Sequence, residues 1–190
     1  MNAPAAINQL NVSYDPEEDR VLLRFNDTAR NEFRFFLTRL LVLKIWPVLV
    51  QLLTKNATKS SVAAPANQEA QKMMLEFAHQ SATEQMDFKS QYDDQQIAAT
   101  PLGEAPLLVH TIELTPRDGG FLLMNLKPKN GQGITLNLDA NLLHAICKLL
   151  ADRVNTIEWG VQLGFTEETA TTPVAPRPPI PPTTPTSNLH

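Results

Sequence analysis

The chain has 190 residues, of which 43% are hydrophobic and 19% are charged, and its formal net charge is −4. This length fits one domain or two small ones with a buried core. The acidic balance excludes the broad basic surface typical of duplex-DNA binders. The single cysteine, Cys147, excludes an intramolecular disulfide and a cysteine-based zinc site.

The N-terminus and the cysteine content both bear on the compartment. Residues 1–10 contain no basic region followed by an apolar core, as a secretory signal would. One cysteine also suits a reducing environment. We therefore expect a cytoplasmic protein.

The first 54 residues are expected to form three strands and a helix. Apolar residues recur with a period of two in residues 7–14, 20–25 and 32–37, which is the pattern of half-buried strands. Thr38 can cap the helix that follows, through about residue 53. The most apolar run of the chain, residues 40–53, lies in this helix. It is shorter than the roughly 20 residues that a membrane span needs, so we expect a buried helix and no membrane span.

The middle of the chain is expected to be a long helix between two linkers. Residues 55–66 and 97–106 are small, polar or rich in Pro and Gly, and they predict the linkers. Neither Gly nor Pro interrupts residues 67–96, which predict the helix. Its expected apolar stripe consists of Ala70, Met73, Met74, Phe77, Ala78 and Ser81.

The pattern of the first unit returns in residues 107–160. Strands are expected at residues 108–114, 121–126 and 134–138, and Asp139 is expected to cap a helix that runs to about residue 154. The last segment, residues 166–190, is rich in Pro and Thr. It is predicted to be a disordered tail, either a plain tether or a ligand for an aromatic groove.

The two units correspond at a shift of 101 positions. Val21, Leu23 and Phe25 then fall on Leu122, Met124 and Leu126, and the cap Thr38 falls on Asp139. Identity is almost nil, so the match is one of pattern. We therefore predict an α+β fold of two pseudo-repeated antiparallel three-strand-plus-helix units, with the long helix between them.

This topology resembles, at the level of the fold, the repeats of the PUR and Whirly families of single-strand binders. Those families use four strands in each repeat, whereas each unit of this sequence has three predicted strands. No residue motif of either family is present. The resemblance implies single-stranded nucleic acid as a possible partner, and fold analogy carries nothing further.

Residues capable of catalysis are few. His144 and Cys147 lie three apart on one predicted helix, but the repeat aligns them with the apolar Leu43 and Trp46, so we expect both in or beside the core. His110 is expected to point inward at the end of a sheet, and His79 has no ligand partner at a suitable spacing. We therefore expect no enzyme, no cofactor and no metal site.

The outward side of the predicted strands is the candidate partner-binding face. Alternation leaves on that side a set of cationic and large apolar residues: Arg20, Leu22, Arg24, Arg34, Phe36, Phe121 and Leu123. Such a face can be left in solvent, be covered by the middle helix, dock a protein, or stack and neutralise a single strand. We expect a non-enzymatic scaffold or adaptor that self-associates. The alternative is a single-stranded nucleic-acid binder.

Overall fold

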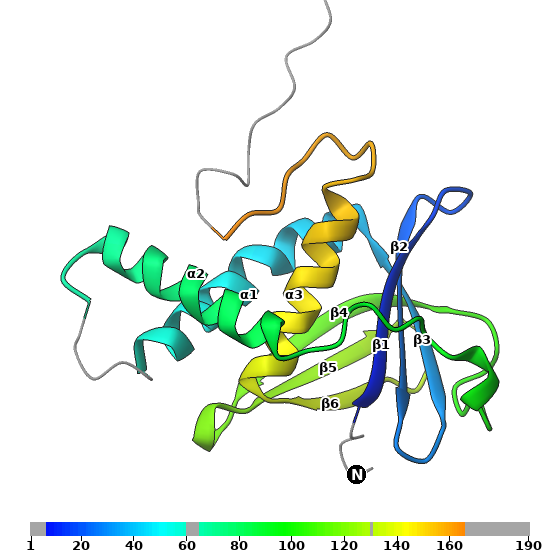
Figure 1. The fold of residues 1–190 in the computed structure, drawn as a ribbon. Helices are drawn as coiled ribbons and strands as arrows, with labels where there is room; N and C mark the ends of the chain where they lie inside the picture. Colours follow the sequence, from blue (N-terminus) through cyan, green and yellow to red (C-terminus); the bar gives the residue numbers. More distant parts are fainter. Residues whose placement is uncertain (1–6, 60–64, 130, 166–190) are drawn as a thin grey trace, which may run out of the picture.

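The computed structural model describes residues 7–59, 65–129 and 131–165, and within them six strands form one sheet in chain order. Three α-helices gather on one side of that sheet (Figure 1). The mixed α+β class predicted from the sequence is therefore confirmed. The predicted tail, residues 166–190, lies outside the described residues.

The first three strands form an antiparallel meander. They are β1 (Ile7–Asp15), β2 (Arg20–Asp27) and β3 (Glu32–Thr38). Successive side chains of a strand point to opposite faces of the sheet, so the apolar alternates of these strands share one face. Helices cover that face. The six residues predicted for it from β2 and β3 are all buried: Val21, Leu23, Phe25, Phe33, Phe35 and Leu37.

The last three strands form a second antiparallel meander. They are β4 (Leu107–Pro116), β5 (Leu122–Pro128) and β6 (Ile134–Leu138). A short parallel contact joins the two meanders, with Phe35 opposite Leu107 and Phe36 opposite Leu108. Beyond that contact β4 continues past the end of β3, so the two halves of the sheet are offset.

Helices α1 (Arg39–Lys59) and α3 (Ala140–Val154) each follow a meander. The predicted caps are confirmed: Thr38 Oγ1 accepts from the Leu41 N–H at 3.2 Å, and Asp139 Oδ1 accepts from the Leu142 N–H at 2.7 Å. Helix α1 continues to Lys59, so the linker predicted from residue 55 begins too early. No Gly or Pro stands between residue 53 and that end.

Helix α2 (Gln68–Glu84) begins where predicted but ends well before residue 96, so the expected long helix is wrong in its second half. Apart from the short 3-10 helix η1 (Asp94–Gln96), residues 85–106 are irregular. Aspartate side chains explain this ending. Asp87 accepts from the backbone N–H groups of Lys89 and Ser90, and such local bonds compete with a helix.

The predicted inward stripe of α2 is wrong at two of its six positions, and the other four, Ala70, Met74, Ala78 and Ser81, are half-buried. Met73 and Phe77 are exposed, whereas Leu75 and Ala82 are buried. Helix α2 packs against α1 and α3, while α1 contacts β3 and β4 and α3 contacts β1 and β6. The helix that was predicted to lie between the two units thus packs on the other two helices.

Helix α1 is long and apolar enough, by length and composition alone, to cross a membrane. This is weak evidence for a span, because core helices pass the same test. One side of α1 is built into the core through Val42, Trp46, Leu49 and Leu53.

The residues after α3 close over the first meander. Trp159 is buried, and its Nε1 donates to Asp19 Oδ1 at 2.6 Å across the turn between β1 and β2. Trp46 Nε1 on α1 donates to the Gly164 carbonyl at 2.9 Å. These bonds tie the residues after α3 to the turn between β1 and β2 and to α1.

Candidate interaction surfaces

A buried carboxylate, that of Glu32, lies at one end of the predicted partner-binding face, beside Arg24 and Arg34. The Glu32 side chain is fully buried and accepts from Arg24 Nε and Nη2 at 2.9 and 2.7 Å, and from Arg34 Nε at 2.6 Å. Arg24 and Arg34 lie directly opposite each other on β2 and β3. Two cations in that position would repel, so Glu32 is the group that holds them side by side.

The segment after α2 lies over this arginine pair. Arg24 also pairs with Asp94, and its guanidinium carbon lies 4.5 Å from the centre of the Tyr92 ring. Burial raises the pKa of Tyr92 above its ordinary value. Arg34 Nη1 donates to the Glu104 carbonyl at 3.0 Å. Both cations are therefore bound within the chain.

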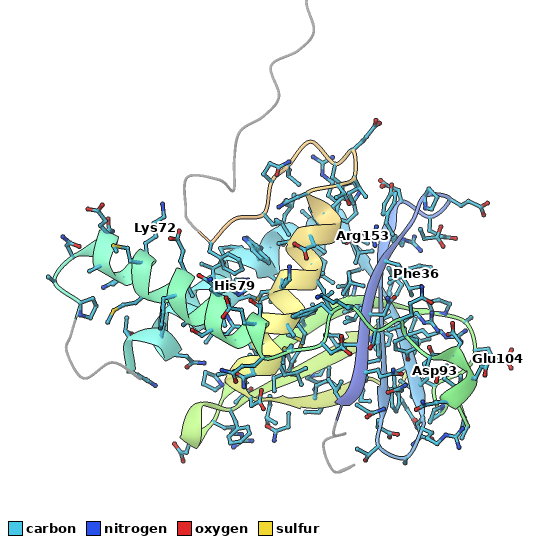
Figure 2. All side chains as sticks on the ribbon, in the orientation of Figure 1. Phe36, Lys72, His79, Asp93, Glu104 and Arg153 are labelled. Atoms are coloured by element: carbon cyan, nitrogen blue, oxygen red, sulfur yellow. The ribbon has the colours of Figure 1, made fainter. Side chains whose placement is uncertain are left out.

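Backbone bonds attach the same segment to β3 and to the turn before it. The Glu32 N–H donates to the Ala99 carbonyl at 2.8 Å, and the Ala98 N–H donates to the Arg30 carbonyl at 2.8 Å. Arg30 Nε donates to the Gln96 carbonyl at 2.6 Å. Figure 2 shows Asp93 and Glu104, from the two ends of this part of the segment, beside the first meander. The cover over the arginines is thus the irregular segment.

The remaining residues of the predicted face divide into two groups. In the first group, Leu22 lies opposite Phe36, and Phe36 lies opposite Leu108. The Arg20 guanidinium carbon lies 5.7 Å from the centre of the Phe36 ring, and Arg20 also forms an ion pair with Glu18 at 2.7 Å. Leu22 and Phe36 are half-buried.

The second group is far along the sheet. Leu123 is half-buried and pairs with Thr115 on β4, and Phe121 is exposed just before β5. Leu108, beside the first group, and Thr115, beside the second, are seven residues apart on β4 (115 − 108). At about 3.3 Å per residue this puts the groups roughly 23 Å apart. They do not form one continuous patch.

Of the four residues considered for catalysis, His144 and Cys147 are buried, His79 is half-buried and His110 is exposed. Cys147 is completely buried, and burial raises the pKa of its thiol, which disfavours the nucleophilic thiolate. His144 is also buried, as expected from the repeat. His110 instead is exposed, at an irregularity in the pairing of β4 with β5, so the inward orientation predicted for it is wrong. Within the described ranges, no group of three or more His, Cys, Asp or Glu residues could hold a metal ion.

An exposed stripe on α2 was not anticipated from the sequence. Met73 is 65% exposed and Phe77, one turn later, is 72% exposed. Lys72 points away from the rest of the molecule in Figure 2. We call the exposed residues Glu69, Lys72, Met73, Glu76 and Phe77 the α2 stripe.

Helix α1 carries a second exposed stripe. Leu40 is 62% exposed and Val48 is 41% exposed, at positions two turns apart on one side of the helix. Lys44 and Lys55 are exposed on the same side. We call these four residues the α1 stripe. Sequence periodicity missed it because α1 is apolar on nearly every side, which hides the direction of its buried face.

Comparison of the chain with protein-family models, with curated proteins and with solved structures found no match.

Proposed function

We propose that this chain is a non-enzymatic scaffold or adaptor that docks a protein partner through the outer faces of α1 and α2. The observation that carries the proposal is the pair of large apolar side chains on α2, Met73 and Phe77, more than 60% exposed and one turn apart. Leu40 and Val48 add a second exposed apolar pair on α1, which packs against α2. Clustered exposed apolar side chains mark interaction surfaces.

The sheet face supports the nucleic-acid alternative less well. Arg24 and Arg34 are bound to Glu32, and Arg20 is bound to Glu18. Affinity for a nucleic-acid backbone comes from cations that can neutralise phosphates. A strand that bound here would first have to displace the carboxylates.

Catalysis also has little support from the described residues. A cysteine nucleophile needs a stabilised thiolate and a nearby base, and Cys147 is enclosed in apolar core. Its helix neighbour His144 contacts a second histidine, His79.

A diverged duplication belongs to the same proposal, because it accounts for the two meander-and-helix halves. Two kinds of observation support it. The caps Thr38 and Asp139 each accept from the backbone N–H three residues later. Buried residues recur at the shift of 101: Val21 and Leu122, Leu23 and Met124, Phe25 and Leu126, Leu37 and Leu138, Val42 and Leu143, Leu49 and Leu150.

Affinity capture of the full chain from its native cell tests the docking proposal. The wild type is compared with Met73→Ser/Phe77→Ser, and with Leu108→Ser/Phe121→Ser, which removes two exposed apolar side chains from the sheet side. Circular dichroism checks that each variant folds. We expect proteins that the wild type and the sheet variant recover and the α2 variant loses. Recovery of the same set by all three variants, or no specific recovery, would contradict the proposal.

A further inference from the structure

We infer that the occupant of the α2 stripe is the α1 stripe of a second copy of this chain. The inference rests on the proposed function and adds the identity of the partner. It comes from the charges that surround the exposed apolar residues on each helix. The proposed contact joins α1 of one copy of the chain to α2 of a second copy.

The α1 stripe is cationic. Helix α1 has four Lys or Arg residues, Arg39, Lys44, Lys55 and Lys59, and no Asp or Glu. Lys44 and Lys55 flank Val48 on the exposed side. Neither lysine forms an ion pair with any residue in the described ranges.

The α2 stripe has the opposite balance. Glu69 and Glu76 flank Met73, and Lys72 is the one cation among its five residues, so the stripe carries a net charge of −1. Glu84 extends the anionic side to the end of the helix. In the part of the chain that the structure describes, neither Glu69 nor Glu76 forms an ion pair.

These charges discriminate between the ways in which two copies can meet. Contact of α1 with α1 opposes two sets of lysines, and contact of α2 with α2 opposes two stripes that each carry a net charge of −1, so both are less favourable than a contact between stripes of opposite net charge. Contact of α1 with α2 opposes lysines to glutamates and buries Leu40 and Val48 against Met73 and Phe77. The α2 stripe, from Glu69 to Phe77, extends about 12 Å at 1.5 Å per residue, and the exposed apolar pair Leu40 and Val48 on α1 spans the same length.

A charge-swap experiment tests this pairing. Light scattering on the full chain over a range of concentrations is applied to the wild type, to Lys44→Glu/Lys55→Glu, to Glu69→Lys/Glu76→Lys and to an equal mixture of both variants. We expect the wild type to associate and each variant alone to associate at least tenfold more weakly. The mixture should recover association, because both α1–α2 contacts between unlike variants then oppose opposite charges. High salt should weaken the wild-type complex.

The control reverses two exposed lysines outside the stripes, Lys89→Glu/Lys129→Glu, and should associate like the wild type. Self-association through these stripes is overturned if the lysine variant still associates, or if the mixture of variants stays monomeric. A wild type that is monomeric at all soluble concentrations overturns self-association too. The proposed function is then still decided by the affinity capture that compares the wild type with Met73→Ser/Phe77→Ser. Sedimentation of a monomeric wild type with phosphatidylserine vesicles, lost in the lysine variant, would instead assign the α1 stripe to a lipid surface.

Discussion

Nδ1 of His79 on α2 lies 3.0 Å from Nδ1 of His144 on α3. At this distance one nitrogen must carry the hydrogen and the other must accept it, whereas two protonated rings would place two donors in contact. His144 is 4% exposed, and the Phe165 ring centre lies 4.1 Å from that of His79. The contact therefore joins α2 to α3 only while at least one ring is neutral.

Acid should weaken the fold through this pair. Burial, with a smaller contribution from His79, lowers the pKa of His144 to about 4. The pKa of His79 is also lowered, by burial and by the charge of Lys148, and Asp152 offsets part of that shift. Because the folded pKa of His144 is below that of the unfolded chain, its contribution is complete above about pH 6.5 and is lost as pH falls toward 4. We expect a loss of about 3 kcal/mol from His144 by pH 4, at roughly 1.4 kcal/mol per pKa unit.

Urea unfolding at a series of pH values checks this expectation with a matched pair of variants. His144→Leu should flatten the pH dependence between 6.5 and 4. His110→Leu changes an exposed histidine outside the pair and should keep the wild-type slope. Equal slopes for the wild type and His144→Leu would show that the pair does not set the acid sensitivity.

Removing the charge of Glu32 should destabilise the first meander. Glu32→Gln keeps the shape of the side chain but leaves Arg24 and Arg34 opposite each other without their shared carboxylate. Loss of one partner from a buried ion pair costs about 3–5 kcal/mol. Glu113→Gln is the control: its ion pair with Lys127 is exposed, and such pairs contribute about 0–1 kcal/mol. Similar free energies of unfolding for both variants would contradict the assigned role of Glu32.

Trp159 should be a large contributor to stability although it lies outside the strands and helices. Its ring is buried, packs edge-on against Tyr14, and donates to Asp19. Trp159→Ala should lower the free energy of unfolding by about 3–5 kcal/mol, as truncation of a buried aromatic does. Trp159→Phe keeps most of the ring and should cost less. Phe121→Ala, at an exposed position, should cost little, and a cost equal to that of Trp159→Ala would contradict this account.

The strands could be predicted from the sequence because their signal is local. Alternation of apolar and polar residues identifies Val21, Leu23 and Phe25 as inward-facing wherever the rest of the chain goes. The caps Thr38 and Asp139 are likewise read from one residue and its following turn. The parallel contact between Phe36 and Leu108 joins residues 72 apart (108 − 36), and no local pattern encodes it.

The surfaces were harder to predict, because exposure depends on distant segments. Arg24 and Arg34 looked outward on β2 and β3, but Asp94 and the Glu104 carbonyl reach them from the segment after α2. Phe77 was predicted to face inward because it falls at helical spacing with the other apolar residues of α2. It is exposed, and the packed side of the helix is the one that carries Leu75 and Ala82.

Single-stranded oligonucleotides provide the last test, since they address the alternative function directly. With Arg20, Arg24 and Arg34 all held in ion pairs and a net charge of −4, we expect no binding to labelled single strands even at low salt. Fluorescence anisotropy at two salt concentrations measures this. Binding that weakens with salt and is lost in Arg20→Ala, a cation outside the Glu32 cluster, would revive a nucleic-acid role for the sheet face. Arg24→Ala cannot replace that variant, because it breaks the buried ion pair and could abolish binding by unfolding the meander.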